Sequence, residues 1–211
     1  MTNPLFTETG APRAWVLLPS GNRLDLADPD PMAWTDEDLA LGLARTYRWG
    51  GHARWQRPLS VAEHSLTVAA IAATRDSSRA MRRLALLHDA EEGLIGFDCI
   101  TPLKQVLGEA FRMLELRLRK AIAQRYTLPW PWPMEAAEIS LKWADRMAAT
   151  AEAVHVAGWS EQDTRDTLGL HYPLPEEDPL VDIGLKANAW EPLNSDTAAD
   201  AWLTALRATT S

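Results

Sequence analysis

The spacing of apolar residues predicts that most of this chain folds into α-helices. In several long stretches, apolar residues recur every three or four positions, which is the period of one helix face. One helix should follow Thr35 and end beside Arg48-Trp49, and the next should begin near Ser60. The other stretches that carry this pattern are 78–92, 103–126, 135–157 and 195–207. The sequence therefore predicts an all-α helical bundle.

Residues 14–26 do not share this helical period. Two short apolar segments flank the turn sequence Pro19-Ser20-Gly21-Asn22, a pattern typical of a β-hairpin. We expect this small N-terminal hairpin to be the only sheet of the protein.

Short polar signals mark where two of the helices begin. Thr35 precedes three acidic residues, so it is expected to cap the helix that follows. Ser60 and Glu63 have the spacing of a capping box, in which each side chain bonds to the backbone N–H of the other residue. Both signals stand directly before an apolar stretch, which supports the predicted helix starts.

The stretch 103–126 is the longest predicted helix. Its apolar face is expected to consist of Val106, Phe111, Leu114, Leu118 and Ile122. The basic residues of the same stretch are Arg117, Arg119 and Lys120. We interpret this charge run as a solvated surface.

Several segments interrupt the helical pattern. Residues 93–102 contain two glycines and a proline, and the proline-rich segment 128–134 should form a stiff corner. Gly158 is a plausible stop for the helix before it. Residues 159–195 are irregular apart from a short helix expected at 160–168, and such a long segment suggests a lid, a packed surface arm or a dimer contact.

The length of 211 residues fits a single domain, 1–211. Its core should span about 35–158, with a C-terminal arm and helix at 159–211. A net charge of −8 and a pI near 5.1 argue against a broad surface for polymeric nucleic acid or anionic membranes. We therefore expect neither as a partner.

The single cysteine, Cys99, excludes an internal disulfide and a cysteine zinc site, and it suits a reducing compartment. The first residues lack the basic start and apolar core of a signal peptide, and no apolar run has the length of a membrane span. We therefore expect a cytoplasmic protein.

The heptapeptide 86–92, Leu-Leu-His-Asp-Ala-Glu-Glu, gathers chemically active groups on little more than one helical turn. On a continuous helix Glu92 lies three residues beyond Asp89 and four beyond His88, so the three side chains can share one side of the helix. They could hold a metal ion. Alternatively, they form a solvated acidic helix end before Gly93.

Two further polar residues fall on inward helix faces. His64 shares a stripe with Val61, Val68 and Ile71, and Asp145 lies among small and apolar residues. A lone inward histidine is more often a satisfied core residue than a ligand. An unpaired carboxylate that faces a core, however, costs several kcal/mol and needs a cation or strong donors.

A divalent cation would satisfy all four inward groups, His64, His88, Asp89 and Asp145. Two neutral imidazoles and two carboxylates match a 2+ charge and leave positions open for water and substrate. The nitrogen and oxygen donors, with no sulfur, suit Co²⁺, Mn²⁺, Zn²⁺, Ni²⁺ or Fe²⁺ and do not choose among them. The long separations along the chain match no short-range metal motif.

Five local sequences carry a resemblance to a known family. In chain order they are Tyr47-Arg48-Trp49, Ser60-Val61-Ala62-Glu63-His64-Ser65, His88-Asp89-Ala90-Glu91-Glu92, Thr101-Pro102-Leu103-Lys104 and Ala144-Asp145. This ordered set resembles the HD-domain metal-dependent phosphohydrolases, and it is most similar to their 5′-deoxynucleotidase branch. The resemblance covers the chain from about residue 20 to residue 157.

The resemblance implies an HD-domain helical bundle with His64, His88, Asp89 and Asp145 as metal ligands. It also implies that Glu92 is the catalytic carboxylate that positions or deprotonates the attacking water. Some HD proteins bind a second metal through further histidines. The absence of such residues between the second and fifth predicted helices favours one divalent transition metal here.

The same resemblance assigns substrate contacts. Arg48 would hold phosphate and Trp49 would pack against sugar or base, although a helix-end arginine and a core tryptophan would give the same pattern. Lys104 is a second candidate for phosphate and Asp98 for the sugar hydroxyl. His52 either touches phosphate or is only a loop residue.

One departure concerns Gly96-Phe97-Asp98, which has an extra residue where relatives tend to show Gly-Asp. The departure puts the assignment of Asp98 in doubt. His155 and His171 have no partners visible in the sequence, and no role is assigned to them.

The leading hypothesis is a metal-dependent phosphohydrolase that removes phosphate from nucleoside 5′-monophosphates, with deoxyribonucleotides as the expected substrates. One alternative keeps the site but releases triphosphate from a dNTP such as dATP. A second alternative is a non-catalytic nucleotide- or metal-binding interaction module. The resemblance and the Pro/Trp-rich segments also lead us to expect a homodimer.

Overall fold

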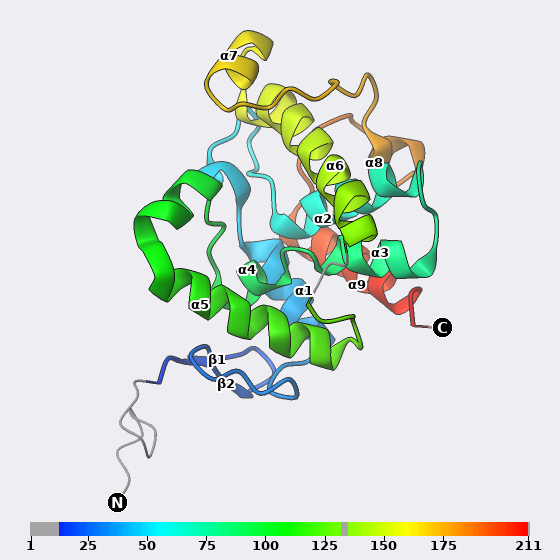
Figure 1. Ribbon diagram of the computed structural model, residues 1–211. Coiled ribbons are helices and arrows are strands. Elements are labelled where there is room, and N and C mark those ends of the chain that lie inside the picture. Colours follow the sequence, from blue (N-terminus) through cyan, green and yellow to red (C-terminus); the bar gives the residue numbers. More distant parts are fainter. Residues whose placement is uncertain (1–12, 132–134, 211) are drawn as a thin grey trace, which may run out of the picture.

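The computed structural model describes residues 13–131 and 135–210, and within them it is mostly helical (Figure 1). The helices are α1 (Asp36–Arg45), α2 (Val61–Ala73), α3 (Arg79–Leu87), α4 (Ala90–Ile95), α5 (Thr101–Arg125), α6 (Glu135–Glu152), α7 (Glu161–Asp166), α8 (Pro179–Asp182) and α9 (Ser195–Arg207). A 3-10 turn, η1 (Arg48–Gly51), follows α1, and a π-helical turn, η2 (Ala153–Ala157), continues α6. No helix in these residues has the length and apolarity needed to cross a membrane.

The predicted hairpin is confirmed. Strand β1 (Trp15–Leu17) pairs antiparallel with β2 (Arg23–Asp25), and Val16 lies opposite Leu24. Leu24 is fully buried, so one face of the hairpin packs on the helices. In Figure 1 the hairpin lies beside α5, and Arg117 of α5 donates to the backbone oxygen of Ala27 at 3.0 Å. Within the described residues these two strands form the whole of the sheet structure.

Helix α2 occupies the centre of the bundle and contacts α1, α3, α6, α8 and α9 (Figure 1). A helix with neighbours on all sides must be apolar nearly all round, and eleven of its thirteen residues are buried. The predicted inward stripe of Val61, His64, Val68 and Ile71 is buried as expected. The imidazole of His64 is therefore held in the middle of the fold.

The predicted cap of α1 is confirmed, whereas only one of the two hydrogen bonds predicted for the α2 capping box is present. Thr35 and Asp38 form a reciprocal capping box on α1. Ser60 Oγ accepts from the backbone N–H of Glu63 at 3.2 Å, as predicted. The carboxylate of Glu63 does not return to Ser60, because it accepts from Lys186 Nζ and from the backbone N–H of Leu193, both at 2.7 Å.

The same contacts fix the irregular segment 159–195 to the bundle. Lys186 lies between the carboxylates of Glu63 at 2.7 Å and Asp178 at 3.0 Å, and all three side chains are buried. Asp178 also accepts from the backbone N–H of Trp190. Buried charges need such pairing, so this segment is packed as an arm against the start of α2. The short helix predicted at 160–168 is confirmed as α7.

The predicted helix 78–92 is wrong in its last turn. Ser78 caps α3, but the helix ends at Leu87 and α4 starts at Ala90. Asp89 has φ −116° and ψ 25°, outside helical geometry. The break leaves His88 and Asp89 at a junction between two helices, and α4 continues beyond the predicted end to Ile95.

The predicted helix 103–126 is confirmed as α5, but its apolar face is wrong at the N-terminal end. Gly108 has φ 74° and ψ −158°, which kinks the helix. Before the kink, Val106 is 81% exposed, whereas Leu118 and Ile122 beyond it are fully buried. The interpretation of Arg119 as a solvated residue is also wrong, because its guanidinium pairs with the buried carboxylate of Glu91.

The predicted end of the first helix beside Arg48-Trp49 is wrong, because α1 ends at Arg45 and the extended residues Thr46 and Tyr47 separate it from η1. Two later boundaries are confirmed. Gly158 has φ 85° and ends η2, and α9 has the predicted bounds. Trp202 and Leu206 of α9 are buried, and Trp202 Nε1 donates to Leu86 O at 3.0 Å. Residues 128–131 are not helical, whereas 132–134 lie outside the described residues.

Two glycines let α1 and α4 approach each other closely. A Cβ on Gly42 would lie 2.3 Å from the carbonyl oxygen of Gly93, and a Cβ on Gly93 would lie 2.8 Å from the backbone nitrogen of Leu43. Gly93 directly follows Glu92, so this contact sets the position of the candidate catalytic carboxylate.

Gly42→Ala should therefore lower the free energy of unfolding by about 2 kcal/mol, because the added methyl group overlaps a backbone carbonyl that cannot move aside. Alanine is the better helix former, so a change of the opposite sign would contradict the close contact. Denaturant unfolding measures this change, with Thr204→Ala at an exposed position of α9 as the control that should cost nothing.

Candidate metal centre

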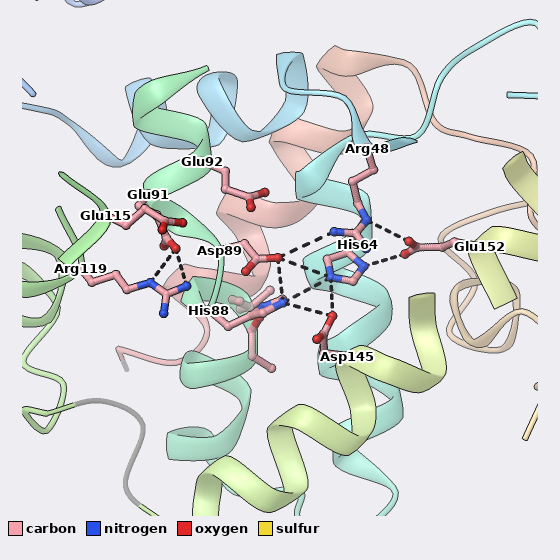
Figure 2. A network of polar contacts seen from close by, with 12 residues as sticks. Arg48, His64, His88, Asp89, Glu91, Glu92, Glu115, Arg119, Asp145 and Glu152 are labelled. Carbon is pink, nitrogen blue, oxygen red and sulfur yellow. Dashed lines mark hydrogen bonds and ion pairs between the residues drawn. The ribbon is translucent and has the colours of Figure 1, made fainter. Parts of the chain in front are cut away.

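Four side chains from separate elements converge on one point (Figure 2). His64 comes from α2, His88 from the end of α3, Asp89 from the start of α4 and Asp145 from α6. His64 Nε2 lies 3.3 Å from His88 Nε2 and 3.3 Å from Asp145 Oδ1. Asp89 Oδ2 lies 3.1 Å from His88 Nε2 and 3.6 Å from His64 Nε2. All four predicted ligands are brought together.

The break between α3 and α4 lets the adjacent side chains of His88 and Asp89 point to the same place. Successive side chains on a continuous helix point about 100° apart, so His88 and Asp89 would diverge. At the junction both point into the cluster, and only 3.1 Å separates His88 Nε2 from Asp89 Oδ2. The extended helix that the sequence predicted would not have brought them together in this way.

The partners of each imidazole assign its tautomer. His88 Nδ1 lies 2.7 Å from the backbone oxygen of Ala85, and His64 Nδ1 lies 2.6 Å from Glu152 Oε1. A carbonyl and a carboxylate accept hydrogen bonds, so each Nδ1 carries a proton. In the neutral rings the lone pairs then sit on the two Nε2 atoms, which face each other at 3.3 Å.

A divalent cation fits these donors. Two atoms that bind one cation at about 2.1 Å are roughly 3.0–3.4 Å apart in tetrahedral or octahedral geometry. Each imidazole Nε2 atom lies 3.1–4.0 Å from the other imidazole and from a carboxylate oxygen of both Asp89 and Asp145, at or slightly above that spacing. Among the described residues, His64, His88 and Asp145 form a group whose donor atoms all lie within 4.8 Å of one another, and Asp89 lies beside this group. Asp145 is 31% exposed, so the cluster is open on its side.

The carboxylates of this cluster favour positive charge on the neighbouring imidazoles. Burial and the charge of Arg48 oppose protonation of His64, but Glu152 and Asp145 raise its pKa to about 9. Burial would raise the pKa of Asp89, yet His88, His64 and Arg48 hold it well below its ordinary value. The site therefore favours positive charge at its centre.

Arg48 and Glu152 border the cluster. Glu152, near the end of α6, accepts from Arg48 Nε at 2.9 Å and from His64 Nδ1 at 2.6 Å, and its side chain is 2% exposed. Arg48 Nη1 lies 3.9 Å from Asp89 Oδ2. Burial opposes the ionisation of Glu152, but Arg48 and His64 lower its pKa to about 2.

Glu92 projects from α4 beside the ligands and makes no contact with them in Figure 2. Its Oε2 atom is buried and has no hydrogen-bond partner among the described residues, and Lys104 Nζ lies 4.0 Å from Oε1. Burial, followed by the charges of Asp89 and Asp98, raises the pKa of Glu92 well above its ordinary value. It is therefore a carboxylate with an unused acceptor and a high proton affinity.

Trp49 follows Arg48 in the sequence, but its side chain packs in an apolar cluster. Trp49 adopts φ 58° in η1 and packs partly buried against an apolar cluster that includes Leu59, Val156 and Trp190. Its Nε1 atom is buried and has no hydrogen-bond partner within the described residues. A positive φ is strained for a residue with a large side chain, so η1 holds this indole in a defined place.

Three other residues were predicted to contact the substrate, and they differ in how they interact with the cluster. Asp98 is half-buried, and burial raises its pKa while Arg48 lowers it, which places it within electrostatic reach of the site. Lys104 Nζ pairs with Glu115 Oε1 at 2.6 Å. His52 is exposed, and no hydrogen bond or ion pair among the described residues joins its ring to the cluster.

The sequence reasoning missed Glu152. It stands seven residues after Asp145, so two helical turns put both on one face of α6. That spacing was a usable signal, but nothing local in the sequence showed that its partners would come from α2 and η1.

Titration with Mn²⁺, Co²⁺ or Zn²⁺ should raise the melting temperature, because a ligand that binds only the folded state adds about 2.7 kcal/mol at 100 times its Kd. Asp145→Asn should weaken this binding by more than about 100-fold, the upper end of what loss of an outer partner costs. Asp200→Asn, at an exposed position of α9, is the matched control. Equal metal affinity in both variants would exclude Asp145 as a ligand.

Comparison with known proteins adds one relative. No protein-family model matches the sequence. An uncharacterized protein of Rhodobacter capsulatus is 40% identical over 177 residues, which cover 82% of this chain and 85% of that protein. Identity of this extent shows common descent over most of both chains. The chain belongs to the same protein family as this uncharacterized Rhodobacter capsulatus protein.

Proposed function

We propose that this protein is an HD-domain metal-dependent phosphohydrolase that removes phosphate from nucleoside 5′-monophosphates, with deoxyribonucleotides as its substrates. One observation carries the proposal. The Nε2 atoms of two imidazoles lie 3.3 Å apart, and each lies within 4.0 Å of a carboxylate oxygen of both Asp89 and Asp145. An arginine and a glutamate with an unpaired oxygen lie next to them. These are the groups that phosphate ester hydrolysis requires.

His64, His88, Asp89 and Asp145 would hold one divalent transition metal, which is Co²⁺, Mn²⁺, Zn²⁺, Ni²⁺ or Fe²⁺ by its donor set. When bound, such a metal supplies Lewis acidity toward a phosphoryl oxygen and makes water more acidic. The side chain of Asp145 is 31% exposed, so a small substrate would approach the ligands from this side.

Arg48 supports the binding of a phosphate group. Its Nε atom is committed to Glu152 at 2.9 Å, and Nη1 is 3.9 Å from Asp89 Oδ2. The Nη side of the guanidinium therefore faces the ligands, where it can donate to phosphate oxygens in a planar, two-pronged fashion. It offsets the negative charge that grows on the phosphoryl group during reaction.

Glu92 supports the proton transfers. In the proposed reaction it accepts a proton from water at a carboxylate oxygen while the water oxygen bonds to phosphorus. The bond between phosphorus and the 5′ oxygen breaks, and that oxygen takes the proton to leave as an alcohol. A carboxylate whose pKa is raised above its ordinary value has a higher proton affinity, which suits this exchange better.

The charges near the site favour a monophosphate over a triphosphate. Among the ion pairs of the described residues, the cations that reach the site carboxylates are Arg48, beside Asp89 and Glu152, and Lys104, beside Glu92. Lys104 is already paired with Glu115 at 2.6 Å. A triphosphate brings two more anionic groups, for which these contacts leave little positive charge.

The substrate assay separates the three hypotheses. Metal-loaded protein incubated with dAMP, dATP and their ribose counterparts should release inorganic phosphate from dAMP, as detected by phosphorus NMR. Release of intact triphosphate from dATP would overturn the monophosphatase proposal. Absence of turnover with all five metals would favour a non-catalytic nucleotide- or metal-binding module.

Glu92→Gln should keep the metal affinity and lower kcat by about 10²–10⁴-fold, the usual contribution of a general base. The amide preserves the size of the side chain but cannot accept the proton of water. Glu109→Gln on the exposed face of α5 serves as the control and should leave kcat unchanged. Full activity in the Glu92 variant would show that another group handles the proton.

A further inference from the structure

We propose that Glu152 is a positioning residue that fixes two working groups at once, the lone-pair direction of His64 and the guanidinium of Arg48. Its predicted effect on turnover rests on the proposed function, whereas its predicted effect on metal affinity does not. Each oxygen of the carboxylate has its own partner: Oε1 lies 2.6 Å from His64 Nδ1, and Oε2 lies 2.9 Å from Arg48 Nε (Figure 2).

The first consequence concerns the metal ligand. A histidine with a proton on Nδ1 presents its lone pair at Nε2, and a carboxylate partner on Nδ1–H locks the ring orientation and increases the basicity of the ring. His64 is completely buried, so bulk water does not compete with this partner in the folded protein. Without Glu152 nothing else in the described structure bonds to His64 Nδ1.

The second consequence concerns the phosphate contact. Arg48 has five N–H donors in a rigid plane, and Glu152 takes the one on Nε. The plane is thereby oriented so that Nη1 points to the ligand side, near Asp89 Oδ2. Figure 2 shows the guanidinium lying between Glu152 and Asp89. A free arginine side chain would sample many rotamers, and it would have to be ordered in each catalytic cycle.

The backbone around Glu152 is built to hold this position. Glu152 ends the α-helical part of α6, and η2 begins at the next residue. In η2 the carbonyl of Val156 accepts from the backbone N–H of Arg54 at 2.8 Å, and that of His155 accepts from Trp55 Nε1 at 3.0 Å. Residues 54 and 55 follow shortly after η1, so the segment that carries Arg48 is fastened to the helix end that carries Glu152.

The placement also links two ligands. Glu152 and Asp145 lie two turns apart on one face of α6, so a single helix supplies one ligand directly and orients a second ligand on α2. A shift of α6 would therefore disturb the metal centre and the phosphate contact together.

The test uses Glu152→Ala and Glu152→Gln in the full-length protein, with Asp178→Asn as a control for the loss of a buried carboxylate elsewhere. Zn²⁺ affinity is measured by competition with a chelator. Loss of a carboxylate behind a ligating histidine typically costs 10–100-fold, so Glu152→Ala should lose about that factor. Asp178→Asn should keep the wild-type affinity.

A second readout follows the histidine itself. In ¹⁵N-histidine-labelled, Zn²⁺-loaded protein, long-range nitrogen–proton correlations should show a proton on Nδ1 of His64, and that signal should be lost or altered in Glu152→Ala. Glutamine has one acceptor oxygen, so Glu152→Gln should keep either the hydrogen bond from His64 Nδ1–H or the one from Arg48 Nε–H, but not both. Either Zn²⁺ affinity stays high while KM for the nucleotide rises, or affinity falls while KM holds.

Wild-type Zn²⁺ affinity and an unchanged His64 signal in a folded Glu152→Ala protein would overturn the inference. So would retention of both affinity and KM in Glu152→Gln. If the wild-type protein hydrolyses no nucleotide, the proposed function fails, but the Zn²⁺ affinity and the nitrogen spectra still decide the role of Glu152.

Discussion

Negative charge buried around His64 is the constraint on which the site depends. Asp89, Asp145 and Glu152 all approach the ring within 3.6 Å, and Arg48 is the cation that contacts two of them. Carboxylates held in the interior are costly unless cations or donors compensate them. The fold meets this demand by joining α2, the α3–α4 junction, α6 and η1 at one point. A divalent metal bound at that point would complete the compensation.

Much of the fold could be predicted because it rests on local signals. Helical periodicity indicated the elements, and Thr35, Ser60 and Gly158 marked their ends through hydrogen bonds made within a few residues. The four candidate ligands were also predictable, since a polar residue on an inward helix face requires a partner. That these four residues meet at one point was predicted only from the resemblance. Residues far apart in the sequence give no information on their distance in the folded chain.

The features that could not be predicted arise from tertiary contacts. The helix break at Asp89 conflicts with helical periodicity and is explained by the cluster that it serves. Glu63 looked like half of a capping box, but Lys186, far along the chain, takes its carboxylate. The kink at Gly108 exposes Val106, which periodicity placed in the core. Glu152 was overlooked because its two partners lie on other elements.

The central claim is that these side chains hold a single divalent metal, and anomalous X-ray diffraction from crystals grown with Mn²⁺ tests it most directly. One strong anomalous peak is expected, at roughly 2.0–2.3 Å from Nε2 of His64 and His88 and from carboxylate oxygens of Asp89 and Asp145. A peak elsewhere, or no peak at this cluster with Mn²⁺ in excess, would contradict it.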